Sequence, residues 1–275
     1  MKVLDWSPES DSFLKKKEIE IHNLYHGELA KNSFQKKEIF GRRSIKMRIR
    51  ALKRLLRMTG HSTFTGKVLD AGAGDGWCSA YLLENYPSLE EIYTMEINEN
   101  AIQSLIPKVI DTVNGDNEKV NLVRGSFNNI PLKNHFDYVI TMGALDHSDN
   151  LYQSFKAIFD SLKDGGYFLA QEPFLRDTVS NDFYHNRGAE TINFKGLVEV
   201  KNDDRTDIFY RLCEYRTAAY HAGFDIEVKD ISLDRANWRR IFMNAVKGKT
   251  QTYNLVFCAH KPKAARPRVP TAWEE

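Results

Sequence analysis

The stretch VLDAGAGDGW, residues Val68 to Trp77, is the part of the sequence that decides the fold. An apolar run leads into it, and Gly72, Gly74 and Gly76 stand at alternate positions within it. Such a cluster can mark a tight turn, because glycine adopts positive φ at little cost. It can also mark a loop where the backbone approaches a cofactor, when a strand precedes it and a helix follows. The surrounding sequence decides between the two interpretations.

Apolar strands and helices alternate on the carboxyl-terminal side of this stretch. Strands are expected at residues 67–72, 91–97, 119–127, 136–144 and 167–173. Helices are expected between them, at residues 77–85, 98–111 and 150–166, the last ending at the pair Gly165–Gly166. A further helix ending at Gly223 leads into two last strands, at residues 224–233 and 251–262. This rhythm, at a spacing of roughly 25 residues, predicts an α/β fold with a doubly wound sheet.

Three further segments set the domain organisation. Residues 1–60 are expected to form a helical cap, in which residues 41–60 carry an apolar stripe at helical spacing. Residues 61–262 form the main domain, and an irregular insertion at about residues 174–211 is expected to act as a lid. Residues 263–275 are Pro-rich and are expected to be a flexible tail.

Composition excludes several classes of protein. The formal net charge of +2 over 275 residues gives no global electrostatic case for nucleic acid or a membrane surface. No apolar run approaches the roughly 18 residues that span a bilayer. Cys78, Cys213 and Cys258 lie far apart, so no disulfide framework and no metal site is expected, and each cysteine is expected to pack as a small apolar residue. The amino terminus does not resemble a signal peptide, which predicts a soluble, cytoplasmic protein.

The residues around the glycines argue against a dinucleotide. The fingerprint G-x-G-x-x-G requires a third glycine for helix–strand packing over a pyrophosphate, and Trp77 stands at that position. The spacing D-x-G-x-G-x-G, which begins at Asp70, instead resembles the first motif of class I S-adenosylmethionine-dependent methyltransferases. That cofactor carries a sulfonium and an ammonium group and no phosphate, so Asp70 and Asp75 suit it electrostatically.

Later segments extend the resemblance from about Lys67 to Pro262, in the order that the family shows. They are GSF with the following NNIPL, FDYVITMGALDH, LKDGGYFLAQEP and AAYHAGFDIEV. The resemblance implies a Rossmann-like sheet of seven strands, mostly parallel with the last strand antiparallel, and S-adenosylmethionine as the cofactor. The residues that it places around the cofactor are Asp70, Gly72, Gly74, Asp75, Glu96, Ile97, Ser126, Phe127 and Gly143.

Two of these positions have individual arguments. Glu96 ends the second expected strand, about 20 residues beyond the loop, where an acid accepts hydrogen bonds from both ribose hydroxyls. Ser126 stands where the family has an aspartate that contacts the adenine amino group. That contact is therefore weaker here, or comes from Asn128 or Asn129.

His147 and Asp146 are the candidate catalytic residues, because they follow the fourth expected strand, where the family often places the residue facing the methyl group. A neutral imidazole could take a proton from the acceptor, and Asp146 could orient the imidazole or bind the substrate. The alternative is a polar cap on the next helix, with Asp149 or Asn150 as the capping residue. Transfer to an amine can also proceed by positioning alone.

Candidate substrate contacts come from two irregular segments. Tyr184, His185 and Arg187 lie in the expected lid, and Tyr25 and His26 lie on the amino-terminal side, from which they could close over the cofactor. The alternative for all five is ordinary packing and solvation.

A basic stripe runs along the expected helix at residues 42–57, which contains no acidic residue; its members are Arg43, Lys46, Arg50, Arg54 and Arg57. It is either the solvated face of the helix or the contact for an anionic partner, such as a phosphorylated substrate or RNA. The signature (N/D)-P-P-(Y/F) of base methylation is absent after the fourth strand, where TMGA stands. DNA amino-methylation is therefore disfavoured.

Together these features predict a biosynthetic methyltransferase that moves a methyl group to an oxygen or nitrogen of a small molecule, such as a sugar, a nucleotide-sugar or a natural product. No partner on a membrane or nucleic acid is expected, and the sequence leaves the oligomeric state open. Two alternatives are an RNA-modifying methyltransferase that uses the basic stripe and a non-catalytic scaffold that keeps the cofactor site. A nicotinamide oxidoreductase is opposed by Trp77.

Overall fold

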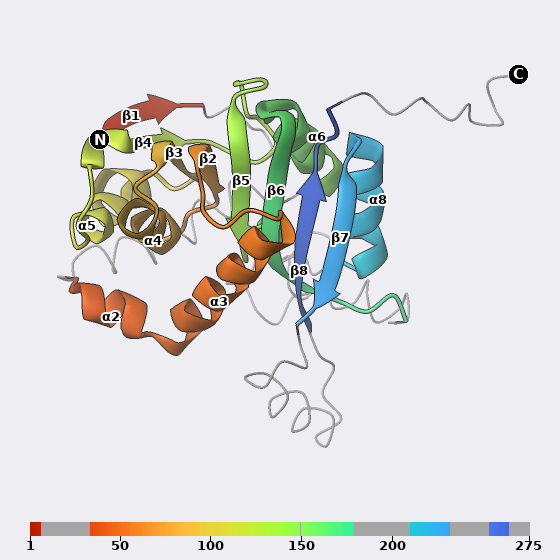
Figure 1. Ribbon diagram of the computed structural model, residues 1–275, viewed down its shortest axis with the longest axis horizontal. Helices are drawn as coiled ribbons and strands as arrows, with labels where there is room; N and C mark the ends of the chain where they lie inside the picture. Colours follow the sequence, from red (N-terminus) through yellow and green to blue (C-terminus); the bar gives the residue numbers. More distant parts are fainter. Residues whose placement is uncertain (7–33, 149, 179–209, 232–252, 264–275) are drawn as a thin grey trace, which may run out of the picture.

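The computed structural model describes residues 1–6, 34–148, 150–178, 210–231 and 253–263, and within them eight strands form one sheet (Figure 1). The strand order is β1-β4-β3-β2-β5-β6-β8-β7. The strands are β1 (Lys2–Asp5), β2 (Gly66–Ala71), β3 (Leu89–Glu96), β4 (Val120–Arg124), β5 (Phe136–Met142), β6 (Leu162–Phe174), β7 (Asp225–Asp230) and β8 (Tyr253–His260). β8 pairs antiparallel with β6 and β7, and the other pairs are parallel. The predicted doubly wound, mostly parallel sheet with an antiparallel last strand is confirmed.

The predicted number of seven strands is wrong, because Lys2–Asp5 forms an additional edge strand. β1 pairs with β4 in parallel, with Leu4 opposite Val123. The first residues of the segment 1–60, which was predicted to be a helical cap, thus form a strand. β1 has only four residues, and Leu4 is its one half-buried side chain, so it shows no alternation long enough to predict a strand.

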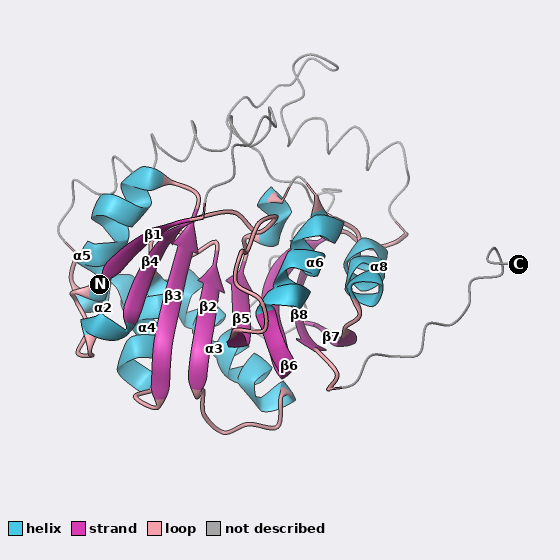
Figure 2. Cartoon of the chain, turned by 90° about the horizontal axis from the view of Figure 1, so that it is seen from above, coloured by secondary structure: helices cyan, strands magenta, loops and turns pink. Residues whose placement is uncertain are grey.

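Each central strand sends alternate side chains to two separate apolar layers. Val68, Ile140 and Leu169 join one core cluster, while Leu69 and Val139 join the other. Helices cover both faces (Figure 2). The first cluster includes residues of α2 (Lys36–Gly41), α3 (Arg43–Met58), α4 (Trp77–Asn85) and α5 (Ile106–Ile110), and the second includes residues of α6 (Leu151–Ser161) and α8 (Leu212–Ala222). This two-sided burial explains the near-continuous apolar runs in the strands.

α3 packs on β6 and β8 with one face and exposes the other. Ile45, Leu52 and Leu56 are buried, as the predicted apolar stripe requires. Arg43, Lys46, Arg50 and Arg57 of the basic stripe are exposed, and Arg54 is half-exposed. The stripe therefore lies on the surface of the helix that faces away from the sheet.

Two predicted helices are shorter than expected. In residues 98–111 a π-helical turn, Ala101–Leu105, precedes α5, because Pro107 in the first turn of α5 lacks the N–H that would continue the α-helical ladder. α6 ends at Ser161, before the Gly165–Gly166 pair, and β6 already begins at Leu162. The pairing register between β5 and β6 shifts between Phe136 and Tyr138, so the glycine pair lies in an irregular start of β6 rather than at a helix end.

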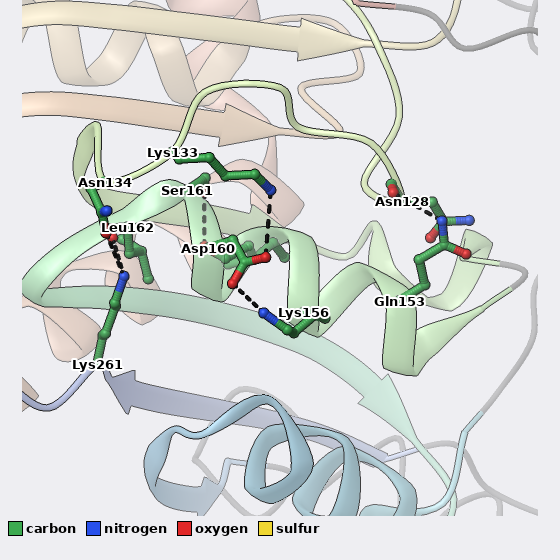
Figure 3. A network of polar contacts seen from close by, with 10 residues as sticks. Asn128, Lys133, Asn134, Gln153, Lys156, Asp160, Ser161, Leu162 and Lys261 are labelled. Carbon is green, nitrogen blue, oxygen red and sulfur yellow. Dashed lines mark hydrogen bonds and ion pairs between the residues drawn. The ribbon is translucent and has the colours of Figure 1, made fainter. Parts of the chain in front are cut away.

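The edge of the sheet at the amino ends of the parallel strands is held by lysine side chains. Lys261, at the end of β8, donates to Asn134 Oδ1 at 2.8 Å and to the Leu162 carbonyl at 2.7 Å (Figure 3). Asp160, near the end of α6, pairs with Lys133 and Lys156 in the same view. These contacts connect α6, β6 and β8, and they lie at the end of the sheet opposite the glycine loop.

The opposite, carboxyl edge of the sheet is where the chain continues into Trp6 after β1, into Leu175 after β6 and into Ile231 after β7. Leu175 and Arg211 form a parallel bridge, in which Leu175 N donates to the Tyr210 carbonyl at 2.9 Å. The predicted insertion at about residues 174–211 therefore starts and ends at one point of this edge.

Two smaller findings concern the burial of the cysteines and the search for a membrane-spanning helix. Cys78 and Cys258 are buried as predicted, but Cys213 is exposed, because it lies in the first turn of α8 on its outer side. None of the helices in the described ranges has the length and apolar character needed to cross a bilayer.

Candidate active site

The glycine loop follows β2 at the point where the strand order reverses. β2 lies between β3 and β5, so the connections from these strands diverge and leave a crevice at the carboxyl edge. Three loops meet around Gly72: a Cβ atom built there would lie 2.6 Å from Ala144 Cβ and 2.9 Å from the ring of Phe127. The loops after β2, β4 and β5 are therefore in direct contact.

Backbone hydrogen bonds fix the glycine loop. Gly72 N and Ala73 N both donate to the Met95 carbonyl at 2.9 Å, which ties the loop to β3. Gly72, Gly74 and Gly76 all have positive φ, at 75°, 58° and 82°. A Cβ at Gly76 would press on Ile106, whereas a Cβ at Gly74 would meet no atom of the described residues within 4 Å. Gly74 is thus the glycine of this loop that borders open space.

Glu96 holds the other side of the loop. Its Oε2 accepts the N–H of Gly74 at 2.9 Å, and its Oε1 accepts those of Ile97 and Asn98 at 2.9 and 3.2 Å. The side chain is 8% exposed. A carboxylate has about four acceptor positions, so Glu96 can accept at least one more hydrogen bond from a ligand. The structure confirms that Glu96 ends β3, as expected for a ribose-binding acid.

Asp70 is buried behind the loop. Its Oδ2 accepts the N–H of Ser79 at 3.0 Å and the hydroxyl of Ser79 at 2.7 Å, and Ser79 in turn accepts from Thr94 at 2.7 Å. Burial raises the pKa of Asp70 to about 6. Ser79 is in the first turn of α4, so Asp70 holds the amino end of that helix. A direct contact of Asp70 with the cofactor stays a prediction.

Asp75 pairs with a basic residue of the amino-terminal helices. Arg42 Nη2 lies 2.7 Å from Asp75 Oδ2, and Asp75 Oδ1 accepts the N–H of Trp77 at 3.3 Å. Lys36 of α2 also pairs with Glu84 of α4. These two ion pairs join α2 and the start of α3 to the glycine loop and α4. The acidic charge of Asp75 thus already faces a cation of the protein itself.

The residues predicted to contact the adenine, Ser126 and Phe127, follow β4, and Ile97, another predicted cofactor contact, follows β3. Ser126 is buried, while Ile97 and Phe127 are half-buried. Each of the two asparagines that were alternatives to Ser126 already has a partner. Asn128 Oδ1 accepts from the Ser154 hydroxyl at 2.6 Å, and Asn129 Nδ2 donates to the Trp6 carbonyl at 3.1 Å. The adenine contacts stay predictions.

The loop after β5 carries the candidate catalytic residues. Gly143 has φ of 75°, and Leu145–His147 form one 3₁₀ turn. Asp146 is buried and His147 is half-exposed. Asn150, not His147, caps α6, because its side chain accepts the N–H of Gln153 at 3.0 Å. The catalytic roles of Asp146 and His147 stay predictions.

Glu172 supports this loop and was not anticipated from the sequence. Its Oε2 accepts the N–H groups of Ala144 and Leu145 at 3.0 and 3.1 Å, and the side chain is fully buried. Burial, together with the nearby charge of Asp146, raises the pKa of Glu172 to about 8. Within the described residues its Oε1 and the Thr141 hydroxyl are buried without a hydrogen bond. A glutamate within the apolar strand segment YFLAQEP was the signal that could have found it.

Five predicted substrate contacts fall outside the described residues: Tyr184, His185, Arg187, Tyr25 and His26. They stay predictions.

Among the residues that the structure does describe, His, Cys, Asp and Glu side chains form no group of three or more that could hold a metal ion.

The comparisons with known proteins agree with this geometry. A family model described as "Methyltransferase domain" matches residues 42–228, from the start of α3 to β7. The chain belongs to this methyltransferase family. It thereby shares the enzyme class and the S-adenosylmethionine cofactor that the family's sequence motifs predict.

Individual relatives of this methyltransferase differ in what they act on. Cycloartenol-C-24-methyltransferase of Arabidopsis thaliana is 30% identical over 171 residues, which are 61% of this chain and 47% of that protein. The chain thus spans about half the length of this relative. Phosphoethanolamine N-methyltransferase 2 of Haemonchus contortus superposes with a TM-score of 0.63 at 18% identity, over 94% of this chain and 61% of that one. Geranyl diphosphate C-methyltransferase of Streptomyces coelicolor gives 0.62 at 10% identity, over 91% and 99%. These two likenesses show the fold.

The residues of the methyltransferase fit S-adenosylmethionine. The open space beside Gly74 leaves room for a ligand against the backbone, and Glu96, beside it, has acceptor capacity left for ribose hydroxyls. Ile97 and Phe127 present half-buried apolar surface on the side where an adenine ring would lie. Together they would hold the nucleoside at the carboxyl edge of β2, β3 and β4.

Proposed function

We propose that this chain is an S-adenosylmethionine-dependent methyltransferase that moves the methyl group to an oxygen or nitrogen atom of a small molecule. S-adenosylmethionine supplies a methyl group on a positively charged sulfur, which a lone pair of the acceptor displaces in line. The observation that carries the proposal is the meeting of the loops after β2, β4 and β5 at Gly72, with Glu96 bonded to the adjacent Gly74.

The contribution of the protein to such a reaction is mainly positioning. The glycine loop is fixed to β3 by two hydrogen bonds to the Met95 carbonyl, and the loop after β5 is fixed by two hydrogen bonds to Glu172. Rigid placement of donor and acceptor can contribute up to roughly 7–11 kcal/mol to lowering a barrier. These two loops support the two reactants from neighbouring strands.

His147 is the proposed general base. It lies half-exposed at the end of the turn that follows β5, next to the buried Asp146. A neutral imidazole there would take the proton of a hydroxyl as the methyl group arrives, or would remove the proton of an ammonium before its nitrogen attacks. Asp146 would orient the imidazole or bind the acceptor. An acceptor that is already nucleophilic would need only the positioning.

The acceptor is proposed to be a small molecule, such as a sugar, a nucleotide-sugar or a natural product. Two features support this. Leu175 and Arg211, the ends of the segment predicted to be a lid, are bridged at the carboxyl edge, and a lid anchored there would suit enclosure of a small ligand. The relatives named above also bear the names of small-molecule substrates, cycloartenol, phosphoethanolamine and geranyl diphosphate. They support a small acceptor but not the choice of atom, because two of them are named as C-methyltransferases and one as an N-methyltransferase.

Calorimetric binding of S-adenosylhomocysteine tests the cofactor part of the proposal. Glu96→Gln should lower the affinity by about 10- to 100-fold, because it removes charge-assisted hydrogen bonds worth about 1.5–3 kcal/mol. Glu90→Gln is the matched control, because Glu90 is exposed near the other end of β3. Unchanged affinity in Glu96→Gln, or in the double variant Asp70→Ala with Glu96→Ala, would remove these residues from the site.

A further inference from the structure

Arg48 lies on the inner side of α3 and reaches the active site. It stands three residues after the buried Ile45 and four before the buried Leu52, and its side chain is half-buried. Arg48 Nη2 is 3.0 Å from the position that a Cβ atom would take at Gly143. Its charge also acts on the Cys78 thiol in the first turn of α4, where it opposes the effect of burial on the pKa of that thiol. The guanidinium group therefore lies between α4 and the loop after β5.

The three acids of the predicted cofactor site are paired with groups other than Arg48. Asp70 accepts two hydrogen bonds from Ser79, and Asp75 pairs with Arg42. Glu96 accepts three backbone N–H groups. Within the described ranges, Arg48 itself makes no hydrogen bond or ion pair. A half-buried guanidinium that forms no ion pair with a described residue has hydrogen-bond donors left over, so this position suits a ligand that brings a negative charge.

We propose that Arg48 is an anion-binding residue of the active site and receives an oxyanion, a carboxylate or a phosphate, of a bound small molecule. The positive end of the α4 dipole points into the same region and favours the same charge. The oxyanion has two sources, the carboxylate at the amino-acid end of the cofactor or an anionic group of the acceptor. This inference rests on the function proposed above.

The first arm of the test compares two ligands that differ at the amino-acid end. S-adenosylhomocysteine carries the carboxylate, whereas 5′-methylthioadenosine lacks the whole amino-acid end. Arg48→Met should weaken S-adenosylhomocysteine by about 10- to 100-fold and methylthioadenosine by less than about twofold, as measured by calorimetry. Arg50→Met is the matched control, because Arg50 is exposed on the outer face of the same helix. This result assigns the oxyanion to the cofactor.

The second arm tests the acceptor as the source. Inorganic phosphate is titrated onto the complex with S-adenosylhomocysteine. If Arg48→Met binds S-adenosylhomocysteine like the wild type but loses phosphate binding by about tenfold or more, while Arg50→Met keeps it, the oxyanion belongs to the acceptor. If Arg48→Met changes neither binding event, the inference is overturned.

Two controls separate this inference from folding and from the proposed function. Arg48→Lys keeps the charge without the forked geometry, so it should fold like the wild type and show an intermediate loss of affinity. If Arg48→Met unfolds, Arg48→Lys is compared with the wild type instead. Equal affinities of the two proteins for S-adenosylhomocysteine and for inorganic phosphate would then overturn the inference. Failure of the wild-type chain to bind S-adenosylhomocysteine would instead contradict the proposed function.

Discussion

Two acids of the cofactor motif, Asp70 and Glu96, perform different tasks although the sequence presents them alike. Asp70 faces inward and stabilises the first turn of α4 through Ser79. Glu96 faces the glycine loop and accepts the N–H of Gly74. Glu96 ends β3 and Asp70 is the last residue but one of β2, and only the structure shows which side each carboxylate takes. The cofactor contact is therefore expected at Glu96, and loss of Asp70 is expected to act mainly through α4.

Replacement of His147 tests its role as general base. His147→Gln should lower the rate of methyl transfer to a hydroxyl acceptor by about 10²- to 10⁴-fold, because a positioned base contributes about that factor. Its affinity for S-adenosylhomocysteine should stay within about twofold, since the residue acts on the acceptor. His221→Gln, an exposed histidine on α8, is the control. A rate within about threefold of the wild type would exclude a base at this position.

Replacement of Glu172 tests the buried acid under the catalytic loop. Its folded-state pKa of about 8 lies above the usual 4.5, so the folded protein binds the extra proton. The stabilisation that comes from this raised pKa of Glu172 is fully present below about pH 4.5, and it is lost as the pH rises through 8. Glu172→Gln should remove this loss, so its melting temperature should fall less than that of the wild type between about pH 5 and pH 9.

The matched variant Glu172→Ala separates the proton from the hydrogen bonds. It leaves the N–H groups of Ala144 and Leu145 without their buried acceptor, which should destabilise the fold by about 1–3 kcal/mol at any pH. Equal pH profiles for the wild type and Glu172→Gln would contradict the assignment of the titration to this residue.

At the scale of the element, two glycines of the glycine loop have different surroundings. Gly72 is packed against its neighbours, and Gly74 borders open space. Gly72→Ala should destabilise the fold by about 2 kcal/mol or more, because its φ is 75° and its Cβ would clash with Ala144 and Phe127. Gly74→Ala should cost only about 1–2 kcal/mol, the strain of its φ of 58°.

Of the variants Gly72→Ala and Gly74→Ala, the one that is less destabilised, Gly74→Ala, should lose more affinity for the cofactor. A methyl group at Gly74 would occupy space against which the cofactor is proposed to lie, so Gly74→Ala should keep its fold but lose affinity for S-adenosylhomocysteine by about tenfold or more. Denaturant titration and calorimetry on both variants measure the two effects. Full affinity in Gly74→Ala would place the cofactor away from this glycine.

The elements differ in how well the sequence predicts them. α4 begins at Trp77 and ends at Asn85 as predicted, because Gly76 in left-handed conformation marks its start. The end of β3 at Glu96 was also predictable from the acid that closes an apolar run. β1 was missed because an isolated four-residue edge strand has no pattern of its own. Its pairing depends on β4, more than a hundred residues away in the chain.

The sequence predicted where in the fold the candidate site lies, but it did not predict which side chains contact one another there. The glycine loop, Glu96 and the loop after β5 lie at one edge, as the alternation of strands and helices required. Arg48 and Glu172 were missed, since each is a charged residue inside an apolar pattern whose purpose depends on a distant loop. The ion pair between Asp75 and Arg42 was not predictable either, because it depends on how α2 and α3 pack on the sheet.

At the scale of the whole molecule, charge is distributed unevenly although it nearly cancels. α3 exposes basic residues on its outer face, while the net charge of the chain is only +2. If this face is simply solvated, transfer to a small acceptor should change by less than about twofold between 50 and 200 mM salt, since no series of phosphates is bound. Binding of RNA that weakens steeply over this range would favour the RNA-modifying alternative.

A triple variant, Lys46→Gln with Arg50→Gln and Arg57→Gln, examines the same point directly. Its affinity for S-adenosylhomocysteine and its transfer rate should equal those of the wild type, because these residues are exposed on the face away from the sheet. A selective loss of RNA binding in this variant would identify the basic face as a nucleic-acid contact.

The bridge between Leu175 and Arg211 has a consequence for how the enzyme can be altered. Leu175 is hydrogen-bonded to Tyr210 and Leu212, the two neighbours of Arg211 in the chain, so the ends of the joining segment are already fixed side by side. The closure entropy of whatever chain joins them depends only weakly on its length. The segment between them can therefore be exchanged for one of different length and composition while the sheet and the cofactor loop keep their register. If this segment selects the acceptor, as predicted, exchanging it between relatives should change the acceptor while the affinity for S-adenosylhomocysteine stays within about twofold.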